Sequence, residues 1–296
     1  MDKNSRLYEK LFTIRAFETT LIEKFSSGIF PGTTHTSLGQ EANAVGVLEH
    51  LEENDVVVSN HRGHGHFLAY GGDPQALFGE LMGKPNGVSR GIGGSQHLHW
   101  RNFYSSGIQG GTLAMAAGMA LAEKQLESNS IVIDFMGDGT LGEGIVYECL
   151  NMISLWQLPL LIVLENNHIA QTTPSDRSIA GDIQARFNAF GLQTTQIDSS
   201  DILEILPLAG ALIGKVRDQR QPHVLIIETA RLGTHSKGDD TRSENEIELL
   251  WLQRDPVAIQ GARLDEKMRC LIEEQVQQKI EAALTAALMA GVVDEH

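Results

Sequence analysis

The chain alternates between two hydrophobic periods. Apolar residues recur every three or four positions from 5 to 27, which is the spacing of an amphipathic helix. Short apolar runs have the length of buried strands, at 56–58, 131–136, 159–164, 194–198 and 223–230. Between them the helical period predicts helices at 40–51, 74–83, 111–126, 142–156, 181–191 and 201–218. This alternation predicts an α/β fold, with a mostly parallel sheet flanked by helices on both faces.

Three segments lack a regular period. Polar residues follow the first strand from 59 to 69, and a glycine-rich stretch covers 84–110, where we expect a long loop. Loops of that length inside a domain are usually functional. Another polar loop follows the last strand, from 231, and the chain becomes helical again from about 244. We therefore expect one α/β domain over residues 1–296 that ends in a helical tail.

The charge balance limits the partners that the chain can have. Thirty-eight acidic and 23 basic side chains give a formal charge of −15. This charge argues against nonspecific binding to nucleic acid or an anionic membrane. A bound phosphate would therefore need local neutralisation by a metal, an arginine or a helix N-terminus.

Cysteine content and hydropathy indicate the compartment. Cys149 and Cys270 are the only cysteines, which form neither a disulfide framework nor a zinc motif. The N-terminus has no signal-peptide pattern, and no apolar run reaches the roughly 18 residues of a membrane span. We expect a reducing, cytoplasmic environment.

The most informative segment lies between 131 and 171. One apolar run ends in Gly-Asp-Gly at Asp138, and the next run ends in an Asn pair at Asn167, 29 positions later. Ligands of parallel sheets bind beyond the carboxyl ends of the strands, where both side chains should lie. Hard oxygen ligands suit Mg²⁺, which usually shares a phosphate with the protein. The segment therefore predicts a site for a metal-bound phosphate ester.

A dinucleotide site is the competing interpretation. Gly137, Gly139 and Gly142 satisfy G-x-G-x-x-G after a strand, and Glu165 ends the next strand as a ribose-binding acid would. Asp138 opposes this interpretation because a carboxylate would face the pyrophosphate in a poorly solvated turn. A divalent cation between the two anions removes the conflict. Asp138 could also be a simple helix cap, but a cap does not require the distant Asn pair.

The motif and its context resemble a known family. The pattern GDG followed by NN is similar to the thiamine diphosphate motif. Its surroundings resemble the α subunit of the E1 component of 2-oxo acid dehydrogenase complexes, of pyruvate, branched-chain or acetoin type. Segments that match in the family's order lie at 35–42, 61–74, 80–97, 137–152, 158–167 and 231–240. The resemblance implies a thiamine diphosphate-binding fold, with this chain as the diphosphate-binding domain.

The resemblance assigns roles to the residues of the metal–phosphate site. Asp138, Asn167 and the backbone carbonyl of Ile169 would bind Mg²⁺. Gly139 and Thr140 would approach the diphosphate of the cofactor through backbone N–H groups, aided by a helix N-terminus.

Further residues would contact the rest of the cofactor. Arg62 would contact the diphosphate as a charged fork, although as an isolated residue it could be a surface arginine. His61 stands where the family usually has a tyrosine that contacts the cofactor. Gly107 and Gln109 match the segment that passes along the aminopyrimidine ring.

Three histidines are candidates for acid–base catalysis. The resemblance places His235 over the thiazolium ring, where it helps acyl transfer, and His35 in the substrate channel. His64 is the third candidate, in the polar segment after the first strand. An imidazole with a pKa near neutrality can donate to a developing alkoxide or shuttle a proton.

The resemblance also implies a reaction and partners. The enzyme would decarboxylate a 2-oxo acid and pass the acyl or aldehyde unit to an acceptor, such as the lipoyl domain of an E2 acyltransferase. The glutamate that activates the cofactor would come from a β subunit carrying the pyrimidine domain, so an α₂β₂ heterotetramer is expected. A split transketolase or carboligase, with an aldehyde or acyl acceptor, is the alternative function. An NAD-dependent oxidoreductase is a further alternative.

Overall fold

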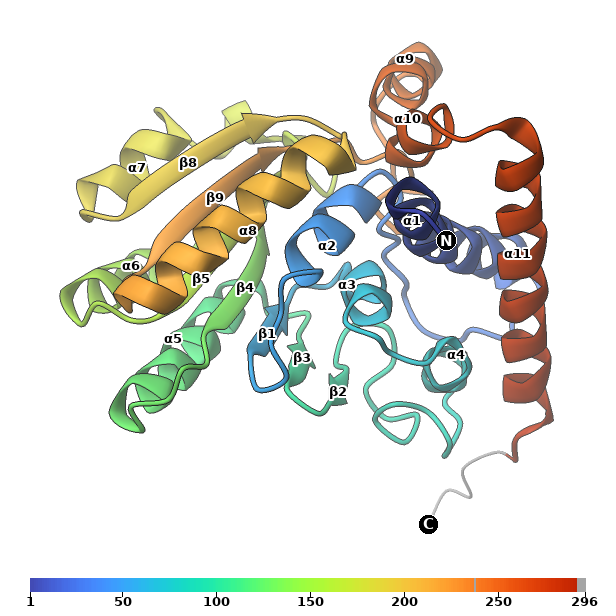
Figure 1. Cartoon of the computed structure of the whole chain (residues 1–296), viewed down its shortest axis with the longest axis horizontal. Helices are drawn as coiled ribbons and strands as arrows, with labels where there is room; N and C mark the ends of the chain where they lie inside the picture. Colours follow the sequence, from blue (N-terminus) through green and yellow to red (C-terminus); the bar gives the residue numbers. More distant parts are fainter. Residues whose placement is uncertain (237, 292–296) are drawn as a thin grey trace.

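A twisted, mostly parallel sheet forms the centre of the fold (Figure 1). The computed structural model describes residues 1–236 and 238–291. Within these residues the main sheet has seven strands in the order β2-β3-β1-β4-β5-β9-β8. Only the β2–β3 pair is antiparallel. The strands are β1 (Val56–Ser59), β2 (His99–Trp100), β3 (Phe103–Ser105), β4 (Val132–Gly137), β5 (Leu160–Asn166), β8 (Gln193–Asp198) and β9 (His223–Glu228).

Helices cover both faces of this sheet, as the alternating pattern predicts. One face packs against α5 (Gln109–Gln125), α6 (Gly144–Leu155) and α7 (Ile183–Ala189). The other packs against α2 (Glu41–Leu48), α3 (Gly63–Ala69) and α8 (Ile202–Gln219). Successive residues of β4 point to opposite faces, so Ile133 and Phe135 join one core cluster while Val132 and Met136 join the other. The predicted α/β fold is confirmed.

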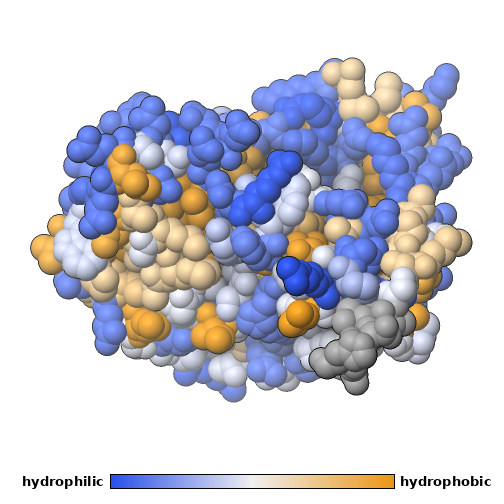
Figure 2. Space-filling view, turned by 90° about the horizontal axis from the view of Figure 1, so that it is seen from below, coloured by the Kyte–Doolittle hydropathy of each residue, from blue (hydrophilic) through white to orange (hydrophobic). Residues whose placement is uncertain are grey.

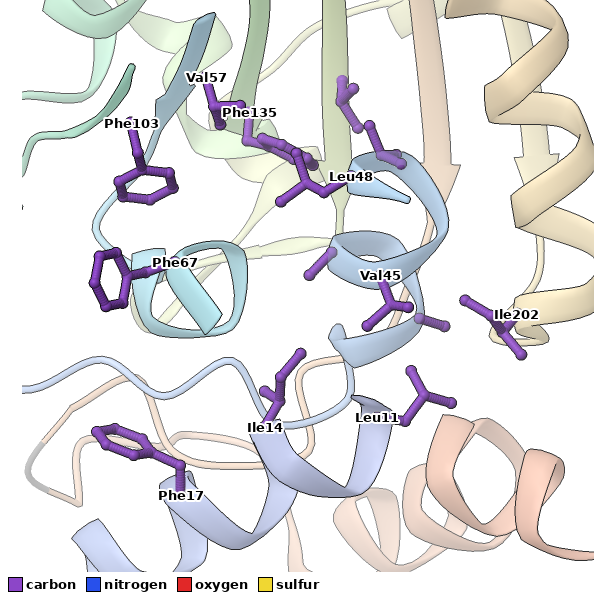
Figure 3. Packing of buried hydrophobic residues seen from close by; sticks show 14 of the residues in the cluster. Leu11, Ile14, Phe17, Val45, Leu48, Val57, Phe67, Phe103, Phe135 and Ile202 are labelled. Atoms are coloured by element: carbon purple, nitrogen blue, oxygen red, sulfur yellow. The ribbon is translucent and has the colours of Figure 1, made fainter. Parts of the chain in front are cut away.

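A second layer of helices packs outside α2 and α3. It consists of α1 (Lys3–Phe25), α4 (Pro74–Leu81) and α11 (Glu266–Met289), and α11 runs beside α1 (Figure 1). Figure 3 shows Leu11, Ile14 and Phe17 of α1 directed toward the side chains of α2, α3 and the sheet. These side chains are almost completely buried, so α1 is part of the main core.

Three sequence-based expectations need correction. The segment 84–110 contains β2 and β3, and β3 pairs both with β2 and with the distant β1, a contact that no local pattern reveals. The expected loop after β1 contains α3, whose glycines have low helix propensity but allow close packing. A Cβ on Gly65 would lie only 2.6 Å from Ser37 Oγ.

The C-terminal part is helical as predicted, but it is not a tail. It forms α9 (Glu244–Arg254), α10 (Pro256–Gly261) and α11, and α11 buries Ile272, Val276 and Ile280 in the core cluster. The domain extent to residue 296 stays a prediction, and residues 292–296 lie outside the described part of the chain. No helix among the described residues has both the length and the apolar character that a membrane crossing requires.

Candidate cofactor site at the carboxyl ends of the strands

A cavity of about 260 Å³ lies where β1, β4, β5 and β9 end. The parallel register brings these ends to one edge, with Gly137 of β4 opposite Glu165 of β5. The predicted site residues that line the cavity are His61, Arg62, Gln109, Asp138, Gly139, Thr140, Asn167, Ile169 and His235. The expected convergence of the polar loops is therefore present.

The predicted metal ligands lie on two adjacent loops. Asp138 begins the 3₁₀ helix η1 (Asp138–Gly142) directly after β4, and Asn167 directly follows β5. The Asn167 Oδ1 atom accepts a hydrogen bond from the backbone N–H of Ile169 (3.2 Å), which closes the second loop. Carboxylate, amide and carbonyl oxygens line one cavity, and this is the hard donor set that Mg²⁺ prefers.

The Asp138 carboxylate is buried where it borders the cavity. It is 1% exposed, and burial raises its pKa, although the hydroxyl of Ser175, which donates a hydrogen bond to it, acts in the opposite direction. The described residues give Asp138 no arginine or lysine partner within ion-pair distance. A buried carboxylate in this situation is suited to a bound cation.

Arg62 provides the opposite charge on the other side of the cavity. Its side chain is buried, and it donates to the carbonyl of Thr36 (2.8 Å) and to Nδ1 of His235 (3.1 Å). Burial, reinforced by the charge of Arg231, lowers the pKa of Arg62 to about 9. Its hydrogen-bond partners among the described residues are neutral, so an anion in the cavity would supply the missing counter-charge. Arg62 is not a surface arginine.

Close packing accounts for the glycine after Asp138. A Cβ on Gly139 would lie 2.6 Å from the Cβ of Ala170, on the loop that follows β5. Any side chain at this position would push apart the two loops that carry the predicted metal ligands. Gly139 therefore keeps Asp138 close to the loop that carries Asn167 and Ile169.

Three imidazoles form one wall of the site. The ring centroids of His35 and His61 are 4.7 Å apart, those of His35 and His235 are 4.6 Å apart, and those of His61 and His235 are 5.5 Å apart. Burial, followed by the charge of Arg62, lowers the pKa of His35 to about 3 and that of His235 to about 4. The same two causes lower the pKa of His61 well below its ordinary value. All three rings are therefore neutral near pH 7.

The contact with Arg62 determines which nitrogen of His235 carries the proton. A guanidinium group can only donate, so Nδ1 of His235 accepts and Nε2 of the neutral ring carries the hydrogen. Both ring nitrogens of His61 are buried, and the Gln109 side chain interacts with this ring. The wall thus offers the Nε2–H group of His235 to a ligand. A protonated Nε2 beside a guanidinium favours a ligand oxygen over a second metal ion.

Three predicted site residues do not line the cavity, and two of them are His64 and Gly107. His64 is completely buried on α3, hydrogen-bonded to Glu18 Oε2 (3.2 Å) and Ser95 Oγ (2.8 Å). A Cβ on Gly107 would lie 2.1 Å from Oε1 of Gln96, so this glycine makes room for that side chain. A catalytic role for His64 and a cofactor contact by Gly107 stay predictions.

His35 is the third predicted residue that lies outside the lining of the cavity. It belongs to the wall through its ring contacts with His61 and His235. Nε2 of Gln96 lies 3.1 Å from Nδ1 of His35, and this hydrogen bond fixes the orientation of the His35 ring.

A single buried carboxylate organises the glycine-rich loop that carries Gln96. Glu80 of α4 is 1% exposed and accepts four backbone hydrogen bonds at 2.6–3.0 Å, from the N–H groups of Ser89, Gly91, Gly93 and Gly94. Such an arrangement satisfies the carboxylate without a cation. The expectation that this long loop serves the site is consistent with its contact to His35.

Other residues also line or support the cavity, including Glu165, which the sequence pattern indicated only as a ribose-binding acid. Glu165 is buried and accepts hydrogen bonds from Asn43 Nδ2 (3.0 Å) and Asn60 Nδ2 (3.2 Å). Asn60 directly follows β1, just as Asn167 follows β5, so its position after a strand was an available signal. Gln40, Asn60, Glu143, Glu165, Ala170 and Gln171 also line the cavity.

Comparisons with known proteins agree with this geometry. The dehydrogenase E1 component family matches residues 9–293. The α subunit of acetoin:2,6-dichlorophenolindophenol oxidoreductase from Bacillus subtilis is 34% identical over 289 residues, which covers 94% of this chain and 87% of that protein. The corresponding subunit from Cupriavidus necator is also 34% identical, over 94% of this chain and 90% of its own length.

A third relative belongs to another enzyme of the same kind. The α subunit of the pyruvate dehydrogenase E1 component from Rhizobium meliloti is 33% identical, over 88% of this chain and 77% of that protein. The family match and these identities agree with the arrangement of the cavity and do not favour the transketolase, carboligase or dinucleotide alternatives. The chain therefore belongs to the dehydrogenase E1 component family, as an α-type subunit of a thiamine diphosphate-dependent 2-oxo acid dehydrogenase.

Proposed function

We propose that this chain carries the metal–diphosphate half of an E1 active site. Asp138, Asn167 and the backbone carbonyl of Ile169 would hold Mg²⁺. The observation that supports this most strongly is the placement of a buried carboxylate and a buried guanidinium on one cavity. When bound, thiamine diphosphate supplies the electron sink for decarboxylation of the 2-oxo acid.

The diphosphate would be neutralised locally. Arg62 offers its guanidinium from one side, and the backbone N–H groups of Gly139 and Thr140 would approach from the other. Local neutralisation is necessary because the chain as a whole has a formal charge of −15. Hydrogen bonds between a phosphate and an ionised donor are about twice as strong as those between neutral groups.

His235 would act on the substrate through Nε2. Arg62 holds its Nδ1 as an acceptor, so Nε2 donates a hydrogen bond to a substrate oxygen and would stabilise the negative charge that develops there. His35, held by Gln96, would restrict the position of the His235 ring, with which it is in contact. Gln109 would lie along the aminopyrimidine ring.

A β subunit would complete the site. Glu165 on this chain is bonded to two asparagine side chains, and Glu143 accepts a hydrogen bond from the backbone N–H of Gly110 (3.1 Å). We therefore assign the activating glutamate to the partner, in an α₂β₂ assembly that passes its product to a lipoyl-bearing E2 acyltransferase. A cytoplasmic location also stays a prediction.

An exposed apolar surface is consistent with the binding of a partner subunit. Figure 2 shows hydrophobic residues gathered on the side of the molecule where α5 lies. Large apolar side chains exposed on or beside α5 and α6 are Ile108, Leu126, Ile145, Met152, Leu155 and Trp156. Apolar surface of this kind marks contact sites between proteins.

Cofactor binding by the chain with its co-purified β subunit tests the proposal. We expect tryptophan fluorescence to be quenched by thiamine diphosphate only with Mg²⁺, and NAD to have no effect. Asp138→Ala and Asn167→Ala should each remove the metal dependence, whereas Asp176→Ala, on an exposed side chain, should not. Unchanged cofactor affinity in the first two variants would overturn the metal site. Full decarboxylase activity of this chain alone would overturn the shared active site.

A further inference from the structure

The loop after β5 returns to the first metal-ligand loop through a short hairpin. β6 (Ile169–Ala170) pairs with β7 (Thr173–Pro174), and the 3₁₀ helix η2 (Ser175–Arg177) follows. The backbone N–H of Ser175 donates to the carbonyl of His168 (3.0 Å), so the end of the hairpin is tied to its beginning. Ser175 therefore lies beside the loop that carries Asn167 and Ile169.

The side chain of Ser175 reaches the other metal-ligand loop. Its Oγ donates a hydrogen bond to Oδ2 of Asp138, and both residues are buried, at 7% and 1% exposure. The contact crosses between loops, because Asp138 follows β4 whereas Ser175 follows β7. The two loops are also in close contact at Gly139 and Ala170.

We propose that Ser175 is a positioning residue that joins the two ligand loops and orients the Asp138 carboxylate for Mg²⁺. This inference rests on the proposed function. By donating to Oδ2, the hydroxyl limits rotation of the carboxylate and directs it with respect to Asn167 and the carbonyl of Ile169. Mg²⁺ demands near-ideal octahedral geometry, so its affinity depends strongly on how well the ligands are held in advance.

The hydrogen bond also replaces part of the water that the buried Asp138 carboxylate gives up, because the Ser175 hydroxyl donates to Oδ2. Ser175 would therefore act as a hydrogen-bonding partner of a metal ligand. Partners of metal ligands typically change metal affinity by about 10–100-fold when they are removed.

The test uses the chain with its co-purified β subunit and Mn²⁺ as a spectroscopic substitute for Mg²⁺. Electron paramagnetic resonance measures free Mn²⁺ during titration in the presence of thiamine diphosphate. Ser175→Ala should weaken Mn²⁺ affinity about tenfold or more. Ser175→Cys, which keeps the volume but donates weakly, should have a similar effect, and Ser175→Thr should retain most of the affinity.

Ser178 supplies a matched control three positions along the same turn. Its hydroxyl donates only to the carbonyl of Ser175 (3.3 Å), so Ser178→Ala should bind Mn²⁺ like the unmodified chain. Thermal unfolding without metal separates the roles, since a purely structural Ser175 would lower the melting temperature and leave Mn²⁺ affinity unchanged. That result in both Ser175→Ala and Ser175→Cys would overturn the inference.

The failures of the two proposals are distinguishable. If the unmodified complex shows no Mn²⁺ binding that depends on thiamine diphosphate, the proposed function itself is wrong. If the unmodified complex binds Mn²⁺ and Ser175→Ala binds it within twofold of the same affinity, only the role of Ser175 is wrong.

Discussion

The strand-end edge with Asp138 and Asn167 and the imidazole wall lie at the same cavity, yet they are built differently. At the edge, Asp138 and Asn167 each follow a strand directly, so their positions depend on the strands alone. In the wall, His35 precedes α2, His61 follows β1 and His235 follows β9, and only the packing of three separate segments brings the rings together. Ligand positions at strand ends are therefore readable from a sequence, whereas a cluster of loop side chains is not.

The two regions also differ in their electrostatics. The edge has a buried carboxylate with no arginine or lysine partner among the described residues, and the wall has neutral imidazoles beside the cation Arg62. Arg62 connects them, because it lines the cavity and also determines the tautomer of His235. The difference predicts that the edge controls cofactor binding and the wall controls turnover.

Removal of the imidazole donor should have the largest effect. His235→Ala in the complex with the β subunit should lower kcat by about 10²–10³-fold, because one positioned hydrogen-bond donor to a developing oxyanion contributes that much. The affinity for thiamine diphosphate and Mg²⁺ should change little. Steady-state kinetics and a cofactor titration measure the two effects. The control is His99→Ala, on an exposed ring, and equal losses of cofactor affinity and kcat would contradict the division between wall and edge.

Removal of the Arg62 guanidinium should have the second largest effect, and this effect should be on cofactor affinity. Arg62→Met should weaken thiamine diphosphate binding by about 30–100-fold, the loss of a charge-assisted hydrogen bond of about 2–3 kcal/mol. Stability without cofactor should not fall in parallel, because a buried charge without a carboxylate partner opposes folding. Fluorescence titration and thermal unfolding are the measurements, with Arg101→Met as a surface control. Unaltered cofactor affinity would show that Arg62 does not contact the diphosphate.

His64 tests the comparison, because the sequence grouped it with His35 and His235 whereas the structure buries it on α3. His64→Leu should destabilise the fold by about 2 kcal/mol, since it leaves polar atoms of Glu18 and Ser95 without their partner. Denaturant unfolding gives this value. Cofactor affinity and kcat of the folded complex should remain close to normal. A large loss of kcat at unchanged stability would instead restore the predicted catalytic role of His64.

The smallest expected effect is on the way the stability of the fold depends on pH. The folded pKa values of His35 and His235 are about 3 and about 4, below the ordinary value of 6.5, so the unfolded chain binds more protons as the pH falls below 6.5. Stability should therefore be complete above about pH 6.5 and decrease as the pH falls toward 4. Thermal unfolding of His35→Gln and His235→Gln should show a shallower decrease than the unmodified chain. Parallel curves would indicate that these rings are not held neutral.

Much of the site followed from local pattern. The strands β4 and β5, the turn at Asp138 and the pair ending in Asn167 are each readable from a few neighbouring residues, and the family motifs lie in the same segments. Glu80 and Gln96 were not readable, because their roles depend on a loop folding around a buried carboxylate and against His35. β3 was missed for the same reason, since it joins the main sheet by pairing with the distant β1.

By itself, the sequence determined the alternation of strands and helices, the edge at which ligands bind and the residues that follow each strand. These properties depend on side-chain periodicity and on the common direction of parallel strands. Only the tertiary structure decided that His64 is buried on α3, that three other imidazoles meet, and that Ser175 reaches Asp138. Such contacts join residues far apart in the chain, and their distances depend on how helices and loops pack against the sheet.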